Sequence, residues 1–279
     1  MKTIVITGVS GFIGQALAQA LVPTHRVIGL SRKAVDLPGV TTIVGDFAEP
    51  TALQKLDAYA IDVLIHLAAV TGGCSEEDGL RVNVGGTHHL LRYLIGRGCR
   101  KFVLASSIAV VGLQSVDFRP LQLPMPDEHP CLDRDGYGFS KYMMEEVTRY
   151  LARQNNALDF INLRLASIVP DEQPVTLAHA GALRPWAIAG VTKMYLSDTV
   201  RCLTLAAEAP PKPGVRILNA VGTQAAVAEP VPVILRSWYG ADVAGLDLRH
   251  YEQPGHERDA LYDIARIKAE LGFVPARAF

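Results

Sequence analysis

Short apolar runs rich in β-branched residues alternate along this chain with longer segments whose apolar residues recur at helical spacing. The short runs predict strands at 2–7, 26–30, 41–44, 62–67, 101–105, 160–165 and 215–221. The helical spacing predicts helices at 15–22, 76–96, 137–154, 197–207 and 263–271. Because apolar strands that alternate with helices form a parallel sheet covered on both faces, the pattern predicts an α/β fold with a doubly wound parallel sheet.

Two proline-containing segments interrupt this alternation. Residues 118–130 contain four prolines and predict a long loop over the strand ends, and residues 170–191 contain three and predict irregular structure. Ser197 is the predicted N-cap of the helix that follows. We expect the irregular segments after Ser167 to form a small lobe above the sheet rather than a separate domain.

The first predicted strand runs into a glycine-rich turn that leads into a helix. The turn reads Gly8-Val9-Ser10-Gly11-Phe12-Ile13-Gly14. Strand, turn and helix in this order place free backbone N–H groups at a helix N-terminus, where the pyrophosphate of a dinucleotide binds. Glycine is needed because a Cβ would obstruct the tight turn and the approach of the phosphates. The sequence therefore predicts a dinucleotide-binding domain made of 1–168 and 194–222, with 169–193 and 223–279 forming a small C-terminal substrate-binding lobe.

Composition excludes several classes of function. The 279 residues carry 27 Lys and Arg against 28 Asp and Glu, so the net charge of -1 argues against a nucleic-acid partner or an anionic membrane surface. The four cysteines are far apart and form no Cys-x-x-Cys or ligand-like His pairing, which predicts free thiols and no metal site. Polar and glycine breaks interrupt the first 22 residues, and no apolar run reaches about 18 residues. We expect a cytoplasmic protein without a membrane span.

Tyr137 and Lys141 are the strongest candidates for proton-transfer chemistry. Residues four apart on a helix share a face, so the phenol and the ammonium point the same way. A phenol has a pKa near ~10, and a neighbouring ammonium stabilises the phenolate and brings that pKa toward neutrality. The pair therefore predicts a general acid or base.

Three polar residues stand at the ends of predicted strands. Ser107 follows a buried strand at the carboxyl edge, where open α/β sheets bind ligands, and it is the candidate for orienting a substrate oxygen. Ser106 is the competing candidate, and we assign it a structural hydrogen bond. His66 could act as a general base, but a structural role at its strand end is the favoured interpretation.

Seven motifs in a fixed order carry a resemblance to a known family. They are Thr7–Gly14, Gly45-Asp46, His66–Ala69, Asn83–Thr87, Ala105–Ser107 with Val111-Gly112, Tyr137–Lys141 and Glu270–Phe273. With these motifs the chain resembles the extended short-chain dehydrogenase/reductases, also described as the NAD-dependent epimerase/dehydratase family. The resemblance implies a Rossmann sheet, a catalytic set of Ser107, Tyr137 and Lys141, and a homodimer formed by the helices around 76–96 and 137–154.

The resemblance also implies a set of dinucleotide contacts. The cofactor-binding residues expected from it are Gly8, Ser10, Gly11, Phe12, Ile13, Gly14, Ser31, Arg32, Asp46, Phe47, Leu67, Ala68, Ala69, Asn83, Tyr137 and Lys141. Ser31-Arg32-Lys33 follows the second strand, and no carboxylate appears before Asp36. Because an arginine at this position accommodates a 2′-phosphate whereas Asp or Glu selects NAD, we expect NADP, with NAD as the alternative.

Departures from the family pattern bear on the reaction. Val111 stands where the family often has Tyr, and Ser167 where nucleotide-sugar enzymes often have Asn. Ile108-Ala109 follows Ser107, so the Asp-Glu pair that related dehydratases use is absent. The expected activity is hydride transfer to a ketone of a sugar or nucleotide-sugar substrate. A nucleotide-sugar epimerase with a tightly held cofactor and a non-catalytic NADP-binding regulator are the alternatives.

Overall fold

The computed structural model describes residues 1–279, which form two compact units. The first unit comprises Met1–Ser106, Asp135–Leu163 and Val200–Ile217, and the second comprises Ser107–Arg134, Arg164–Thr199 and Leu218–Phe279. The division expected from the sequence placed residues 107–134 in the dinucleotide-binding domain, whereas the structure groups them with the second unit.

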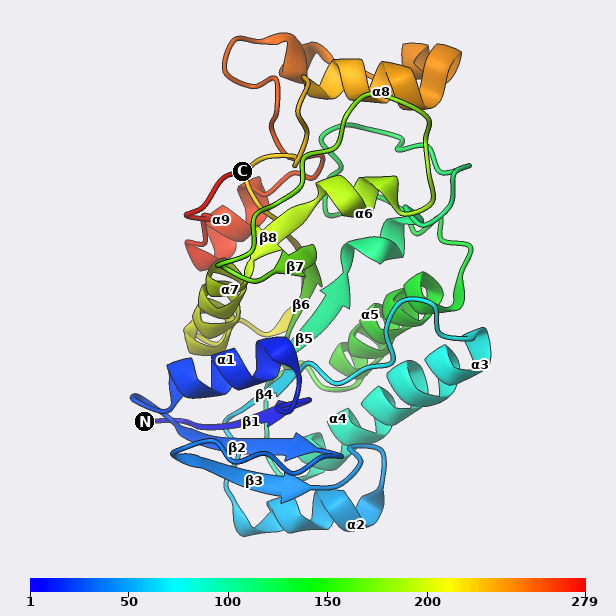
Figure 1. Cartoon of the computed structure of the whole chain (residues 1–279). Helices are drawn as coiled ribbons and strands as arrows, with labels where there is room; N and C mark the ends of the chain where they lie inside the picture. The colour runs from blue at the N-terminus through cyan, green and yellow to red at the C-terminus, as the bar shows by residue number, and fades with distance from the viewer. The chain divides into compact units, whose positions relative to one another are not determined.

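A seven-stranded sheet in the order β3-β2-β1-β4-β5-β6-β9 is the central element (Figure 1). Its strands are β1 (Thr3–Thr7), β2 (Arg26–Ser31), β3 (Val40–Val44), β4 (Val63–His66), β5 (Lys101–Ser107), β6 (Asp159–Leu165) and β9 (Gly214–Ala220). The helices are α1 (Phe12–Leu21), α2 (Pro50–Leu53), α3 (Glu76–Asp78), α4 (Thr87–Gly96), α5 (Gly136–Gln154), α6 (Ala187–Val191), α7 (Leu196–Glu208), α8 (Val231–Tyr239) and α9 (Ala265–Leu271). Strands β7 (Ser167–Val169) and β8 (Lys193–Tyr195) form a separate two-stranded sheet.

The strand order reverses at β1, which pairs in parallel with β2 on one side and with β4 on the other. The chain therefore adds β2 and β3 on one side of β1 and then β4, β5, β6 and β9 on the other side. In open parallel sheets such a reversal creates a crevice at the carboxyl ends of the two central strands. The predicted glycine turn follows β1 and so lies at this crevice.

Helices cover both faces of the sheet in the first unit. Val5, Ile28 and Leu64 belong to one hydrophobic core together with Leu91 of α4 and Met144 of α5. Side chains alternate along a strand, so the neighbours of Val5 point to the opposite face, where Figure 1 shows α1. The predicted doubly wound parallel α/β fold is confirmed.

The helix predicted at 76–96 is confirmed as a continuous helical segment, and within it a π-helical stretch, Gly79–Gly86, joins α3 to α4. Close approaches at its two terminal glycines accompany the irregularity. A Cβ on Gly79 would lie 2.7 Å from the carbonyl oxygen of Gly136, and one on Gly86 would lie 2.8 Å from Cε2 of Phe47. Single π-helical turns occur frequently at functional sites.

The second unit has its own hydrophobic core, to which α6 and α8 contribute. Helix α8 was not predicted from the sequence, although its buried Val231, Ile234, Leu235 and Tyr239 follow helical spacing. Pro230 and Pro232 argue against a helix in this segment of the sequence. Proline is nevertheless tolerated in the first turn of a helix, because the N–H groups there have no partner within the helix.

Residues 118–130 have no helix or strand, as predicted, but they are firmly held within the second unit. The Oδ1 of Asp127 accepts a 2.5 Å hydrogen bond from the backbone N of Asn219, and its carbonyl oxygen accepts one from Arg164. Burial raises the pKa of Asp127 to about 6. The prediction of Ser197 as an N-cap is wrong: α7 begins at Leu196, and the Ser197 hydroxyl donates to Asp171 at 2.5 Å.

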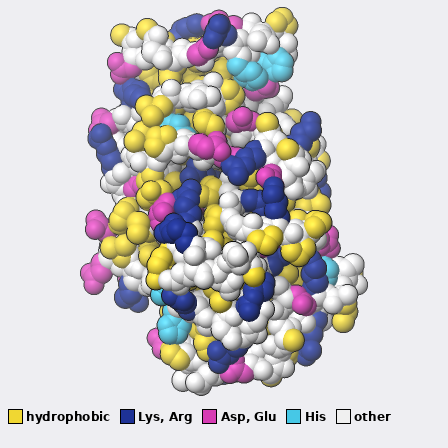
Figure 2. All heavy atoms as spheres, turned by 180° about the vertical axis from the view of Figure 1, so that it is seen from behind, with side chains coloured by type: hydrophobic (Ala, Val, Ile, Leu, Met, Phe, Trp, Pro, Cys, Tyr) yellow, Lys and Arg dark blue, Asp and Glu magenta, His cyan; other side chains and the backbone are white.

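Charged side chains of both signs lie among hydrophobic and neutral ones on the face drawn in Figure 2. None of the helices combines the length and the apolar character that crossing a membrane requires.

Candidate active site

The three glycines of the turn after β1 differ in what a side chain at each position would contact. Gly8 has φ +73°, and a Cβ there would lie 2.9 Å from the backbone N of Ala68. A Cβ on Gly14 would collide with the carbonyl oxygen of Gly8 and lie 2.8 Å from Cα of Val9, so α1 packs on the turn only because Gly14 has no side chain. A Cβ on Gly11 would meet only the oxygen of Gly8, at 3.2 Å. Gly8 and Gly14 are therefore required by the fold, whereas Gly11 leaves space for a ligand.

A cavity of about 740 Å³ lies within the first unit at the ends of β1, β2, β3 and β4. Of the residues expected to contact a dinucleotide, it is lined by Gly8, Ser10, Gly11, Ser31, Arg32, Asp46, Phe47, Leu67, Ala68 and Ala69. The further lining residues Leu30, Val70, Thr71 and Val82 were not predicted from the sequence, and Gly45 and Lys33 were named only as parts of a motif and of the basic turn. Most of these residues are direct chain neighbours of predicted cofactor contacts, and this adjacency could have identified them as lining residues.

The size and lining of the cavity suit a bound dinucleotide. Gly11 lines the cavity and has no side chain to occupy the space, and the volume of the cavity lies within the range of about 300–1,000 Å³ typical of ligand sites. Gly11 is the N-cap of α1, so the free N–H groups of the first helical turn follow it directly. The residues present therefore suit a pyrophosphate at the turn.

Six expected cofactor residues do not line the cavity: Tyr137 and Lys141, which lie in α5, and four others. Phe12, Ile13 and Gly14 form the first turn of α1 and do not line the cavity. Asn83 is fully buried, and its amide accepts from the backbone N of Val70 at 2.8 Å and donates to the oxygen of Val70 at 2.9 Å and to Oγ of Ser140 at 2.9 Å. Asn83 therefore differs from the expectation, because it holds the segment that forms the cavity wall instead of lining the cavity.

His66 is held on both ring nitrogens at the end of β4. Its Nδ1 lies 2.6 Å from Oγ1 of Thr7, and its Nε2 lies 2.9 Å from Oγ1 of Thr87. Thr7 Oγ1 also accepts from the backbone N of Ala68, so we assign its hydrogen to His66 Nδ1 and the ring hydrogen to Nε2. Burial lowers the pKa of His66 to about 3. These contacts confirm the structural interpretation of His66.

Tyr137 and Lys141 lie in the first two turns of α5. The N-cap Asp135 starts this helix, because its Oδ1 accepts from the backbone N of Tyr137 at 2.8 Å and of Gly138 at 3.0 Å. Lys141 Nζ lies 5.8 Å from the ring centroid of Tyr137. It donates a 2.8 Å hydrogen bond to the carbonyl oxygen of Ala105 in β5. The expected shared face of the two side chains is therefore present.

The electrostatics of Lys141 suit proton-transfer chemistry. Lys141 is 3% exposed, and its burial lowers the pKa of the ammonium to about 8, against the opposing effects of Cys74 and Glu145. A lysine that titrates near neutrality can change its charge state at working pH, which an exposed lysine cannot do.

The two serines at the end of β5 differ in their bonding. Ser106 donates from Oγ to Oε1 of the buried Glu145 at 2.6 Å, which confirms its structural assignment. Ser107 ends the strand and belongs to the second unit. Its Oγ accepts from the backbone N of Ala109 at 3.1 Å, a bond that does not use the hydroxyl hydrogen.

The sheet with its strand reversal and the glycine turn beside the cavity are the features of a Rossmann-like dinucleotide-binding fold. The model of the NAD dependent epimerase/dehydratase family matches residues 4–184, and the chain belongs to this family. The resemblance to the extended short-chain dehydrogenase/reductases is thereby confirmed, and with it an NAD-dependent class of enzymes.

Two relatives illustrate the range of the family. UDP-glucose 4-epimerase 2 of Oryza sativa subsp. japonica is 27% identical over 185 residues, which cover 59% of this chain and 44% of the relative. Uronate dehydrogenase of Pseudomonas syringae pv. tomato is 25% identical over 175 residues, or 61% of each chain. The match spans about half the length of the epimerases.

Solved structures support the fold over the whole chain. MoeE5 in complex with UDP-glucuronic acid and NAD has a TM-score of 0.72 at 21% identity, with 99% of this chain and 94% of that chain covered. Uronate dehydrogenase from Agrobacterium tumefaciens has a TM-score of 0.71 at 17% identity, with 99% and 85% covered.

Proposed function

We propose that this chain is an NAD(P)-dependent oxidoreductase that transfers a hydride between the nicotinamide and an alcohol or ketone carbon of a sugar or nucleotide sugar. The observation that carries the proposal is the buried Lys141, bonded to Ala105 and placed on the same helix face as Tyr137. A regulator that only binds the dinucleotide has no need of a buried ammonium beside a phenol.

The mechanism assigns one task to each of three side chains. The bound dinucleotide supplies the hydride in the reductive direction. Tyr137 donates its phenolic proton to the substrate oxygen, and the Lys141 ammonium stabilises the phenolate that remains. Ser107 orients the same oxygen by donating its hydroxyl hydrogen, since its Oγ already accepts from Ala109.

NADP is the cofactor we propose, with Arg32 as the group that recognises the 2′-phosphate. Arg32 and Lys33 are both exposed and both line the cavity. Asp36, the first carboxylate after β2, is exposed and does not line it. The Ser31 hydroxyl donates to the carbonyl oxygen of Lys33 at 2.6 Å and so fixes the turn that carries these charges.

An epimerase is the second candidate, because relatives include UDP-glucose 4-epimerases as well as a uronate dehydrogenase. The two activities share the same hydride and proton transfers and differ in whether the cofactor is consumed. Ile108 and Ala109 follow Ser107 without an acid–base pair, which supports simple hydride chemistry over dehydration.

The test is a panel of UDP-sugars, free uronates and aldoses, and the corresponding keto sugars, incubated with the purified chain and each dinucleotide. Absorbance of the reduced nicotinamide measures net oxidation or reduction, and chromatography of the sugars measures epimer formation. Net turnover of cofactor supports the oxidoreductase. Epimers without net turnover support the epimerase, and tight dinucleotide binding with neither reaction supports the regulator.

The proposal includes a cytoplasmic homodimer that associates through the helices around residues 76–96 and 137–154. Leu80 and Tyr150 lie in these elements and are 37% and 43% exposed, which leaves apolar area for a partner. The four free cysteines suit a reducing compartment. Light scattering at micromolar concentration tests the association: a dimer supports it, and a monomer contradicts it.

A further inference from the structure

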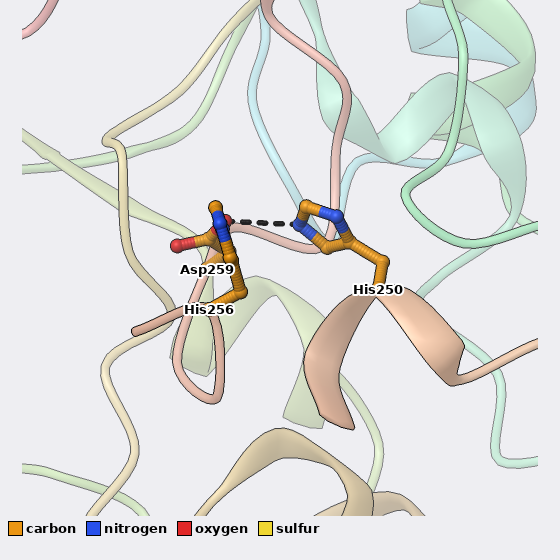
Figure 3. A group of neighbouring side chains, drawn as sticks. All are labelled: His250, His256 and Asp259. Carbon is orange, nitrogen blue, oxygen red and sulfur yellow. Dashed lines mark hydrogen bonds and ion pairs between the residues drawn. The ribbon is translucent and has the colours of Figure 1, made fainter. Parts of the chain in front are cut away.

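Two histidines and an aspartate converge in the second unit. His250 lies in the short helical turn Arg249–Glu252, and His256 and Asp259 lie in the loop after it. Figure 3 shows the His250 ring facing the Asp259 carboxylate. Nε2 of His250 lies 2.9 Å from Oδ2 of Asp259, and Nδ1 of His256 lies 2.8 Å from the same oxygen.

The backbone under these side chains is anchored on both sides. Tyr251, beside His250, is 1% exposed and donates from its hydroxyl to the carbonyl oxygen of Ala260 at 2.9 Å. Ala260 N in turn donates to the oxygen of Thr223 at 3.0 Å, and Val231 N to that of Glu257 at 2.7 Å. The turn with His250 and the loop with Asp259 are therefore tied together through buried groups, so their side chains meet without further folding.

We propose that His250, His256 and Asp259 bind a divalent transition metal of the Zn²⁺ class. Two imidazole nitrogens and a carboxylate oxygen are donors that Zn²⁺ accepts, whereas Mg²⁺ and Ca²⁺ prefer oxygen alone. One ligand atom from each residue lies within 4.8 Å of the other two. Metal–ligand distances of about 2.1 Å separate tetrahedral ligands by about 3.4 Å, so small side-chain rotations complete the site. Solvent fills the remaining coordination position.

Binding replaces the two hydrogen bonds to Asp259 with bonds to the ion. A neutral imidazole must then carry its hydrogen on the other nitrogen, Nδ1 of His250 and Nε2 of His256. Solvent can accept from these N–H groups, since His256 is exposed and His250 is half-buried. The ion would join the turn that carries His250 to the loop that carries His256 and Asp259, and so stabilise the second unit. The sequence alone predicted no metal, because the three ligands are adjacent only after the loop has folded.

The experiment is isothermal titration of the full, untagged chain with Zn²⁺, with Mg²⁺ as the comparison ion. The wild type should bind one equivalent of Zn²⁺ more tightly than Mg²⁺. Loss of an outer-shell partner costs about 10–100-fold in affinity, so loss of a ligand in His256→Ala or Asp259→Asn should cost at least about tenfold. The melting temperature should rise with Zn²⁺ in the wild type and not in these variants.

His179→Ala is the matched control. His179 is exposed and pairs with only one carboxylate, that of Glu229 at 3.1 Å, in the same unit. This variant should keep wild-type affinity for Zn²⁺. Equal affinity in the wild type, His256→Ala and Asp259→Asn, or no preference of the wild type for Zn²⁺ over Mg²⁺, would overturn the site.

Discussion

Lys141 Nζ donates a 2.8 Å hydrogen bond to the carbonyl oxygen of Ala105, so the side chain of α5 that stands one turn after Tyr137 is fastened to β5. A second bond joins the same two elements, from Oγ of Ser106 to the carboxylate of Glu145 at 2.6 Å. Both pairs are buried. The helix therefore has a fixed rotation and height against the strand, and the position of Tyr137 follows from that.

The charge of Lys141 should appear in the pH dependence of ketone reduction. Burial lowers the pKa of its ammonium from 10.5 to about 8, so the charge that stabilises the Tyr137 phenolate is present below this value and lost above it. We expect kcat/KM for reduction to fall as the pH rises through about 8. Arginine stays charged over this range, so Lys141→Arg should be slower and should keep only the alkaline fall that deprotonation of Tyr137 itself causes. The same fall in both proteins would refute the assignment.

Gly11→Val should block dinucleotide binding and leave the fold intact. Gly11 lines the cavity, and a Cβ at this position would meet only the oxygen of Gly8 within the protein. Fluorescence titration with NADPH measures the affinity, and circular dichroism checks the fold. Gly245→Val is the control, because its Cβ would meet no atom within 4 Å. Unchanged NADPH affinity in Gly11→Val would disprove the location of the pyrophosphate.

Gly14→Ala should act on stability. Its Cβ would press against the backbone of Gly8 and Val9, and overpacking of this kind costs about 1–3 kcal/mol. Urea denaturation should show a loss of unfolding free energy in that range, with Gly245→Ala as the matched control. A Gly14→Ala protein as stable as the wild type would show that the turn relaxes easily.

Arg32→Ala should weaken NADPH far more than NADH. A charge-assisted hydrogen bond contributes about 1.5–3 kcal/mol, or about ten- to a hundredfold in affinity, and only NADPH carries the 2′-phosphate. Lys268→Ala removes the same charge at an exposed position in α9 and should change neither affinity. Equal losses for both dinucleotides in Arg32→Ala would leave Arg32 without a role in selectivity.

Local patterns predicted the parts of the site that are local in the chain. The glycine turn and the Tyr137–Lys141 face each need only a few consecutive residues, and both are where the pattern placed them. The partners of Asn83 and Ser106 could not be predicted in this way. Ser140 is 57 residues from Asn83, and Glu145 is 39 residues from Ser106, so only the packing of α5 brings them together.

The central claim is that Tyr137 is the proton donor of a hydride-transfer reaction. Tyr137→Phe removes only the phenolic oxygen, so turnover should fall by about 10²–10⁴-fold while NADPH binding stays nearly intact. Tyr150→Phe, an exposed tyrosine of the same helix, is the matched control and should keep wild-type turnover. The decisive measurement is steady-state turnover of the two variants with the best substrate of the sugar panel. A Tyr137→Phe protein that turns over as fast as Tyr150→Phe would contradict the account.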